Sequence, residues 1–307
     1  MRTRAHKLCW IMAMFVLLAN RANAGGANPF NFLFLDAGAR SAGLAGAYTA
    51  LAKDSVALHY NPAGLAWTED HEATFMHNQY FERITQEYAA YASPWGFGGI
   101  LNHLSFGNAT QTTYSNADGA GMGSQGMSDL AVSLGYGRIL AKGLGLGAGL
   151  KYIRESIAGY SAQGHAVDIG VLYDADVFMN GVTVGVAIKN MGPDIKFQGT
   201  EEKLPLNLQG GASYRFNIGD LKNTMVADIS RERNEPAIFA SGLESVILKS
   251  FPIRLGYSTR NQAGLGVTAG MGYRHKIFGV DYAFAPYGNL GSVHRISLTI
   301  KWGQNKY

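Results

Sequence analysis

The chain has 307 residues, of which 47% are hydrophobic, 16% are charged and 40 are glycine. Its formal net charge of +4 comes from four basic residues in the first 24 positions, a stretch without acidic residues: Arg2, Arg4, Lys7 and Arg21. The rest of the chain contains 22 basic and 22 acidic residues. This balance gives no support to nucleic-acid binding.

Residues 1–24 have the pattern of a secretory signal peptide. The basic start is followed by an apolar run of 12 residues, Leu8 to Ala19, and by the small-x-small sequence Ala22-Asn23-Ala24. The run is too short for a spanning helix of about 20 residues, so an uncleaved membrane anchor is the less favoured alternative. The only cysteine, Cys9, lies inside this run. We therefore expect an exported protein without disulfides.

Most of the chain after residue 70 alternates between apolar and small or polar residues. Examples are the segments 144–152, 167–173 and 296–302. Successive side chains of a strand point to opposite faces, so each segment has one apolar face. The segments reach the ~9–11 residues that a tilted strand needs to cross a bilayer. The pattern predicts an all-β protein, a transmembrane antiparallel β-barrel in the outer membrane of a Gram-negative bacterium; a soluble β-sandwich is the alternative.

We expect about 14 strands, an even number as in single-chain outer-membrane barrels. If the first strand runs outward, the longest connections, 108–125 and 191–203, lie on the outer side. Short turns such as Ser93-Pro94-Trp95 and His275-Lys276 then lie on the inner side. The predicted strands are 71–80, 84–93, 96–107, 126–137, 142–155, 163–174, 181–190, 204–216, 221–230, 235–247, 251–260, 263–275, 276–285 and 292–302.

Residues 25–68 do not alternate, and we predict that they form a small helical hatch inside a barrel of residues 69–307. The segment 40–52 is rich in alanine and glycine. Asp54 or Ser55 is a candidate cap for a further helical turn, which Asn61-Pro62 would end. The predicted inner wall is lined by glycines that leave space for this hatch: Gly145, Gly147, Gly149, Gly170, Gly185, Gly211, Gly256, Gly270 and Gly272.

Several charged residues of the strands are candidate lumen groups. They could anchor Asp36 or Asp54 of the hatch or line a route, and the simpler alternative is that an aqueous interior tolerates them. The candidate residues are Arg154, Asp168, Arg215, Arg254, Arg274 and Arg295.

The sequence contains no complete catalytic or cofactor-binding motif. His71-Glu72 begins like a zinc-protease motif, but Phe75 stands where the second histidine is needed. The glycines of 121–126 match a dinucleotide-binding pattern by letter, but a strand pattern follows where a helix should begin. We therefore predict no catalytic, metal or cofactor site, and an enzyme on the barrel is the least favoured hypothesis.

Two stretches resemble a known family. The first is Gly38 to Asp54 followed by Leu58-His-Tyr-Asn-Pro-Ala-Gly-Leu65, and it looks like the N-terminal hatch of the PorV/PorQ proteins and, more distantly, of FadL-type transporters. The second, Val280 to Leu298, looks like the closing hairpin of the PorV/PorQ group. The resemblance implies a hatch motif formed by Gly43, Gly46, Asp54, Asn61, Pro62 and Gly64. Gly303 to Tyr307 follow the last predicted strand, which departs from the usual ending.

The resemblance implies a 14-stranded outer-membrane barrel with its N-terminal segment in the lumen. PorV-type members serve type IX protein secretion, whereas FadL-type members take up hydrophobic molecules through a lateral opening. The closing hairpin favours an accessory protein of secretion, with secreted cargo or secretion-system subunits as partners besides the membrane lipid. The alternative is a FadL-like channel for fatty acids or other hydrophobic small molecules. An apolar pocket between the hatch and the wall, with a kink in one strand, would favour the channel.

Overall fold

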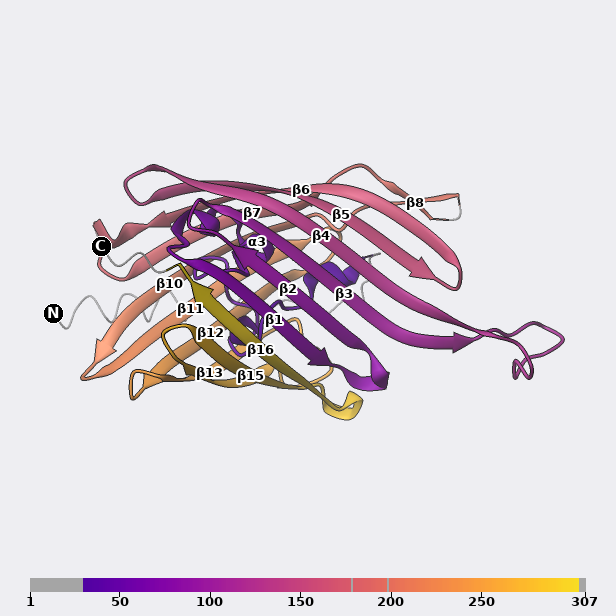
Figure 1. Cartoon of the computed structure of the whole chain (residues 1–307). Helices are drawn as coiled ribbons and strands as arrows, with labels where there is room; N and C mark the ends of the chain where they lie inside the picture. Colours follow the sequence, from indigo (N-terminus) through magenta and orange to yellow (C-terminus); the bar gives the residue numbers. More distant parts are fainter. Residues whose placement is uncertain (1–29, 178, 198, 304–307) are drawn as a thin grey trace.

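The computed structural model describes residues 30–177, 179–197 and 199–303 of the chain. The predicted signal peptide, residues 1–24, lies outside the described residues. Fourteen antiparallel strands form a closed barrel in the order β1-β16-β15-β14-β13-β12-β11-β10-β7-β6-β5-β4-β3-β2. Figure 1 shows this barrel with the N-terminal segment inside it. The predicted fold class is therefore confirmed.

The strand boundaries lie close to those expected from the alternation. The wall strands are β1 (His71–Gln79), β2 (Thr85–Ala92), β3 (Phe97–Thr110), β4 (Ser124–Ala141), β5 (Leu144–Ile157), β6 (Tyr160–Asp174), β7 (Val182–Met191), β10 (Asn207–Ile218), β11 (Leu221–Glu232), β12 (Ala237–Ile247), β13 (Phe251–Ser258), β14 (Val267–Arg274), β15 (Phe278–Pro286) and β16 (Ser292–Trp302).

The connections differ in length between the two ends of the barrel. One end, the short-turn end, has connections such as Ser93 to Gly96 and Lys142-Gly143. The other, the long-loop end, has the loop 111–123 and the loop 192–206, which contains the hairpin of β8 (Ile195–Phe197) and β9 (Thr200–Glu202). Because long loops face outward in outer-membrane barrels, the long-loop end corresponds to the predicted outer side.

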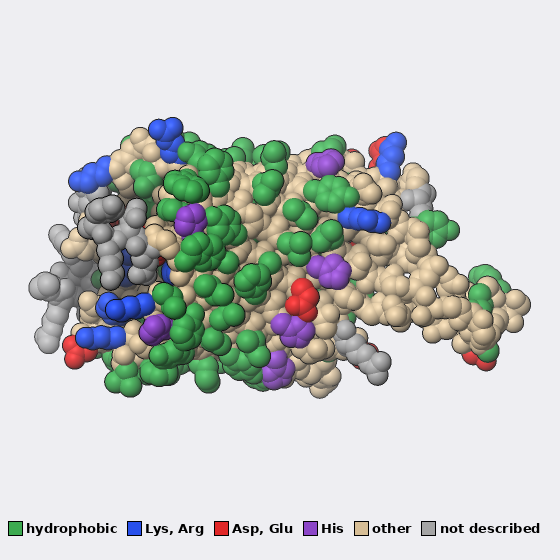
Figure 2. All heavy atoms as spheres, viewed as in Figure 1, with side chains coloured by type: hydrophobic (Ala, Val, Ile, Leu, Met, Phe, Trp, Pro, Cys, Tyr) green, Lys and Arg blue, Asp and Glu red, His purple; other side chains and the backbone are tan. Residues whose placement is uncertain are grey.

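The outward face of the wall is apolar. Leu134, Leu150 and Leu255 are among the exposed side chains of this face, and Figure 2 shows hydrophobic side chains gathered in a broad band across the side of the barrel in view. Aromatic residues stack at the short-turn end, where the ring of Trp302 lies 5.7 Å from that of His71. Tyr88 of β2, by contrast, points inward and is buried against the hatch. None of the helices within the described ranges is long and apolar enough to cross a membrane.

The hatch, residues 30–68 of the described chain, contains four short helices joined by turns. They are the 3₁₀ helix η1 (Asn31–Phe34), α2 (Ala39–Ala42), α3 (Ala57–Tyr60) and the 3₁₀ helix η2 (Pro62–Trp67). Three further 3₁₀ turns lie between strands: η3 (Phe81–Arg83), η4 (Ala175–Val177) and η5 (Gly288–Leu290).

The expected helix cap is absent at α3. Its N-cap residue is Val56, with no side-chain cap bond. The Ser55 hydroxyl donates instead to Glu72 of the wall, and Asp54 accepts from the Tyr48 hydroxyl. Because both residues lie in the lumen, their side chains make tertiary contacts and do not cap α3.

The predicted lumen glycines other than Gly272 lie where the hatch approaches the wall closely. A side chain at Gly147 would overlap with the backbone of Pro62, and one at Gly145 with the ring of Trp67. On the opposite wall, the Cα atom of Gly43 lies within contact distance of Gly270. Small wall residues thus let the hatch backbone pack directly on the strands.

Candidate functional site in the barrel lumen

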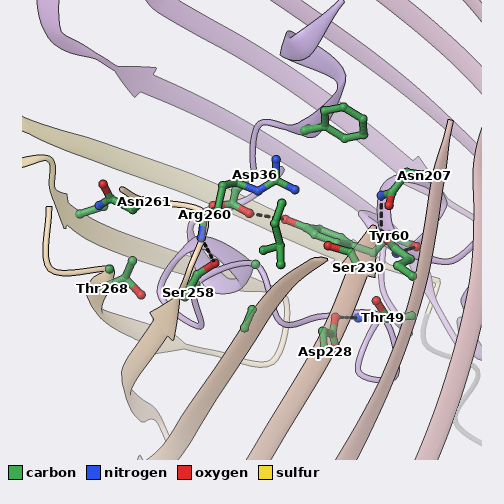
Figure 3. A pocket seen from close by; sticks show the side chains of 18 of the residues that line it. Asp36, Thr49, Tyr60, Asn207, Asp228, Ser230, Ser258, Arg260, Asn261 and Thr268 are labelled. Carbon is green, nitrogen blue, oxygen red and sulfur yellow. Dashed lines mark hydrogen bonds between the residues drawn. The ribbon is translucent and has the colours of Figure 1, made fainter. Parts of the chain in front are cut away.

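The hatch leaves a cavity at the long-loop end, which we call the outer pocket. It has a volume of about 80 Å³ and lies between the hatch and the wall from β7 to β16. In Figure 3 the side chains of Asp36 and Tyr60 point toward each other, and the Tyr60 hydroxyl lies 3.4 Å from Asp36 Oδ1. The carboxylate of Asp228 accepts bonds of 2.8 Å from the backbone N–H groups of Tyr48 and Thr49 and so fixes the hatch turn at the edge of the pocket.

Cations and unsatisfied polar atoms give the outer pocket its chemical character. Lys189, Arg260 and Arg295 line it together with Asp36 and Asp228. Arg295 is 2% exposed and donates from Nη2 to the Tyr80 hydroxyl at 3.1 Å. Among the described side chains, its Nε atom and Oδ1 of Asn207 are buried without a hydrogen-bond partner. Buried polar atoms without partners favour a polar ligand or water in such a site.

An apolar region, the outer apolar cluster, adjoins this pocket. Its hatch members are Phe30, Phe32 and Leu33, which meet inward-facing wall residues and two residues of the loop 192–206. Ala285 belongs to both the cluster and the pocket lining. The wall and loop members are Leu104, Ala131, Ile153, Ala162, Ala166, Val293, Ile195 and Leu204. A water-filled porin has a polar interior, so these apolar inward positions distinguish this lumen from one.

A β-bulge lies beside this region, where β6 pairs with β7. The pairing shifts between Val167 and Ile169, and two successive residues of β7, Lys189 and Asn190, are both buried. Asn190 has a positive φ of 60°, and its backbone N–H donates to Asp168 Oδ1 at 2.7 Å. Bulges are sites at which a strand can bend and redirect its side chains.

A second cavity, the inner pocket, lies at the short-turn end of the lumen and has a volume of about 110 Å³. Helix α2 separates the two pockets, since Asp36 lines the outer one and residues 37–41 line the inner one. The contacts of α2 with the wall involve small residues: Ala39 and Ala42 pack on Ala283. The Ala39 N–H donates to the Ser297 hydroxyl at 2.7 Å. This single helical turn is thus the barrier between the pockets along β14 to β16.

A buried ion-pair network holds α2 in place. Arg40 of the hatch donates from Nη2 to Glu244 Oε1 at 2.7 Å, and Arg254 donates from Nε to Glu244 Oε2 at 2.6 Å. Arg254 also donates to Asp281 at 2.7 Å and is fully buried. We call Arg40, Glu244, Arg254 and Asp281 the latch. One carboxylate therefore links the hatch to a buried cation of the wall.

The hatch groups around the latch have shifted pKa values. Burial opposes the charged form of Arg40, but the acidic groups beside it, Glu244 first, together outweigh burial and raise the pKa of Arg40 above its ordinary value. Burial, and next the charge of Glu72, raises the pKa of Asp54. Arg40 therefore remains charged, and Asp54 binds a proton at a higher pH than an exposed aspartate does.

The buried imidazole of His59 predicts that the stability of the docked hatch depends on pH. Burial, and next the charges of Lys189 and Lys151, lowers the pKa of His59 well below 6.5. A released hatch would have a normal histidine, so the docked state binds fewer protons and loses stability as the pH falls below about 6.5. We expect cleavage by a protease added from the short-turn side to increase from about pH 7.5 to about pH 5.5. The His59→Gln variant should lack this increase; an unchanged pH response in the variant would contradict the assignment.

A model of the uncharacterised protein family UPF0164 matches residues 18–205, which include the hatch and the first half of the wall. The chain belongs to the UPF0164 family. A search of curated proteins gave no match.

Solved barrels share the fold of this UPF0164 protein. The CymD monoaromatic hydrocarbon channel is 11% identical, with a TM-score of 0.60 over 91% of this chain and 100% of that one. The toluene transporter TodX of Pseudomonas putida is 13% identical, with a TM-score of 0.57 over 86% of this chain and 97% of TodX. At these identities the likeness concerns the fold, which is that of outer-membrane barrels.

The structure brings the hatch-motif residues of this UPF0164 protein together at tight backbone contacts. Gly46 has a positive φ of 78°, and a side chain at Gly64 would overlap with the carbonyl of Ala52. The Asn61 amide donates to the carbonyls of Thr49 and Val171, at 3.2 and 3.0 Å. Pro62 begins η2 beside Gly147. Gly43 packs against Gly270 and Asp54 contacts Tyr48, as described above.

The predicted lumen charges fall into three groups. Asp168 and Arg295 are buried near the long-loop end, and Arg254 is buried in the latch. Arg215 and Arg274 lie at the short-turn rim, where they pair with Asp176 at 2.9 Å and with Asp281 at 3.4 Å.

Arg154 does not face the lumen, and this expectation was wrong. Its neighbour Ile153 is fully buried inside the barrel, so the alternation of β5 turns the exposed Arg154 outward.

Sequence reasoning missed the partners Arg40 and Glu244. The available signal was parity, because Glu244 follows Ala240 and Gly242 on the inward face of β12. Within the parts of the chain that the structure describes, no group of three or more histidine, cysteine or acidic side chains is placed to hold a metal ion.

Proposed function

We propose that this protein is a non-enzymatic outer-membrane channel for the uptake of small hydrophobic molecules. The observation that carries the proposal is the outer apolar cluster, an apolar chamber inside the barrel filled by the hatch residues Phe30, Phe32 and Leu33. A ligand that displaced these side chains would exchange one apolar contact for another. The cluster lies between the hatch and the wall, beside the β-bulge of β6 and β7. An apolar site at this place and an irregular strand pairing both support a channel.

Two further observations support a route through the lumen. The outer and inner pockets lie on the two sides of α2, which is only four residues long and packs through alanine and glycine. CymD and TodX, whose titles describe a hydrocarbon channel and a toluene transporter, share the fold. The role in secretion that sequence analysis placed first rests on its two sequence stretches alone. We therefore place the channel first and the secretion accessory second.

A pair of substitutions at Phe32 tests the chamber. Phe32→Ala should enlarge an apolar cavity, which then binds a small hydrophobic probe several-fold more tightly. Phe32→Asp should place a charge there and weaken binding several-fold. Binding of a fluorescent naphthylamine dye, displaced by toluene, measures both effects on the purified full-length protein. The matched control is Val226→Ala in the separate cluster under the hatch, which should leave dye binding unchanged.

Uptake itself is tested in cells. A strain that lacks the protein should accumulate radiolabelled toluene more slowly, and expression of the Phe32→Asp variant should fail to restore the rate. Equal dye affinity in both Phe32 variants, or full uptake by the deletion strain, would overturn the proposal. Crosslinking of the loops 111–123 and 192–206 to secreted proteins would instead support the secretion role.

A further inference from the structure

Four histidines form a one-sided belt on the outside of the barrel, near the long-loop end. They are His77 on β1, His103 on β3, His165 on β6 and His294 on β16, and the alternation of each strand turns them outward. We call them the histidine belt. Figure 2 shows histidine side chains gathered along the edge of the hydrophobic belt that lies toward the long loops.

The strand register places these side chains in a nearly continuous row. His77 pairs with Glu87, and Glu87 pairs with His103. The row continues through Leu130 to Arg154, which pairs with Gln163. Adjacent strands lie about 4.8 Å apart, and diagonal neighbours such as Arg154 and His165 about 7–8 Å. The outward-facing Arg154 thus belongs to the same row as the histidines.

The belt occupies one side of the barrel only. Strands β7 and β10 to β14 contain no histidine. On the belt side, the ionisable groups that face the histidines come from neighbouring strands. The Glu87 carboxylate accepts a hydrogen bond of 2.6 Å from His77 Nδ1, and the Tyr282 hydroxyl lies 2.8 Å from His294 Nδ1. The Tyr152 ring lies 5.5 Å from that of His165, and Arg154 supplies a permanent positive charge.

We propose that the histidine belt and Arg154 bind phosphate groups of lipid headgroups in the outward-facing leaflet. The row lies where the apolar belt ends, which is the level of the headgroups in a barrel of this kind. Arginine binds phosphate through charge-assisted hydrogen bonds, and the ring N–H groups of histidine can donate to the same oxygens. Glu87 is the one carboxylate in the row. Such binding would orient one side of the barrel toward anionic lipid, and it does not depend on the transport of any molecule.

Lipid retention by the full-length protein tests this inference. The protein is purified from mixed micelles that contain equal amounts of phosphatidic acid and phosphatidylcholine, and native mass spectrometry counts the lipids that remain bound. We expect several-fold more phosphatidic acid than phosphatidylcholine. Replacing the four belt histidines with glutamine should lower this ratio, and Arg154→Gln should lower it as well.

The control is His275→Gln, because His275 is exposed in a turn at the short-turn end. This variant should retain phosphatidic acid like the unchanged protein. The single substitutions His77→Gln and His165→Gln provide the same comparison should the fourfold variant fail to fold. A ratio of about one in the unchanged protein, or an equal loss in His275→Gln, would overturn the inference.

Discussion

Gly147→Val is expected to drive the hatch out of the lumen while leaving the barrel closed. A side chain at this position would overlap with the backbone of Pro62, and backbone atoms cannot rotate away as a side chain can. The wall strand β5 is hydrogen-bonded to β4 and β6 along its length, so the hatch is the element that must move. We expect a large increase in ion conductance across planar bilayers and rapid cleavage of the hatch by trypsin at Lys53.

The control for this experiment is Gly210→Val on the outward face of β10. A Cβ atom there would meet its nearest neighbour, the Gly185 carbonyl, at 3.8 Å, so the hatch should stay docked. A variant without residues 30–68 gives the conductance of an empty lumen, and the change in electrophoretic mobility on boiling reports barrel closure. The hatch assignment fails if Gly147→Val is closed, protected from trypsin and as poorly conducting as the unchanged protein.

Arg254→Met is expected to produce the largest loss of stability. Arg254 is fully buried between Glu244 and Asp281, and its removal leaves two buried carboxylates with fewer cations. Breaking a buried ion pair from one side costs about 3–5 kcal/mol. Urea titration of the protein in lipid vesicles measures this loss. Because Glu244 also holds Arg40, the same variant should expose the hatch to protease.

The matched control is Arg274→Met, which removes an arginine from the same carboxylate, Asp281, at the exposed rim. Exposed ion pairs contribute about 0–1 kcal/mol, so this variant should unfold close to the unchanged protein. Adding Asp281→Asn to Arg254→Met should recover part of the loss, since it removes one uncompensated charge. Equal effects of the two arginine substitutions would mean that burial of the latch has no energetic role.

The period-two alternation was sufficient to predict the strands, their faces and the lumen glycines, because each of these follows from local backbone geometry. It also contained the information needed to place Arg154. Lys151 and Arg154 are three residues apart on one regular strand, so they must face opposite sides. The prediction that Arg154 faces the lumen followed its charge and not its parity. Arg154 is tolerated outside because it lies at the edge of the apolar belt.

The contacts of the hatch could not be predicted in the same way. Arg40 and Glu244 are 204 positions apart, and no local pattern links a turn in the lumen to one strand among fourteen. Asp54 and Ser55 are residue types that favour helix caps, but in the lumen both side chains make hydrogen bonds to other residues instead. Asn61-Pro62 was predicted to end a helix, and α3 ends at Tyr60 as expected. The end of a helix can therefore be predicted from the local sequence, whereas the partners of buried polar groups depend on which strands the closed wall brings together.

The pairing of β1 with β16, from His71 opposite Trp302 to Gln79 opposite His294, has a consequence for biogenesis. The hatch precedes β1 in the chain, and the ring of strands is complete only when the final strand arrives. The hatch contacts both strands of this seam, through Ser55 with Glu72 on β1 and through Ala39 with Ser297 on β16. Its full set of wall contacts therefore exists only when the first and last strands have paired, so closure of the barrel and completion of hatch docking are coupled.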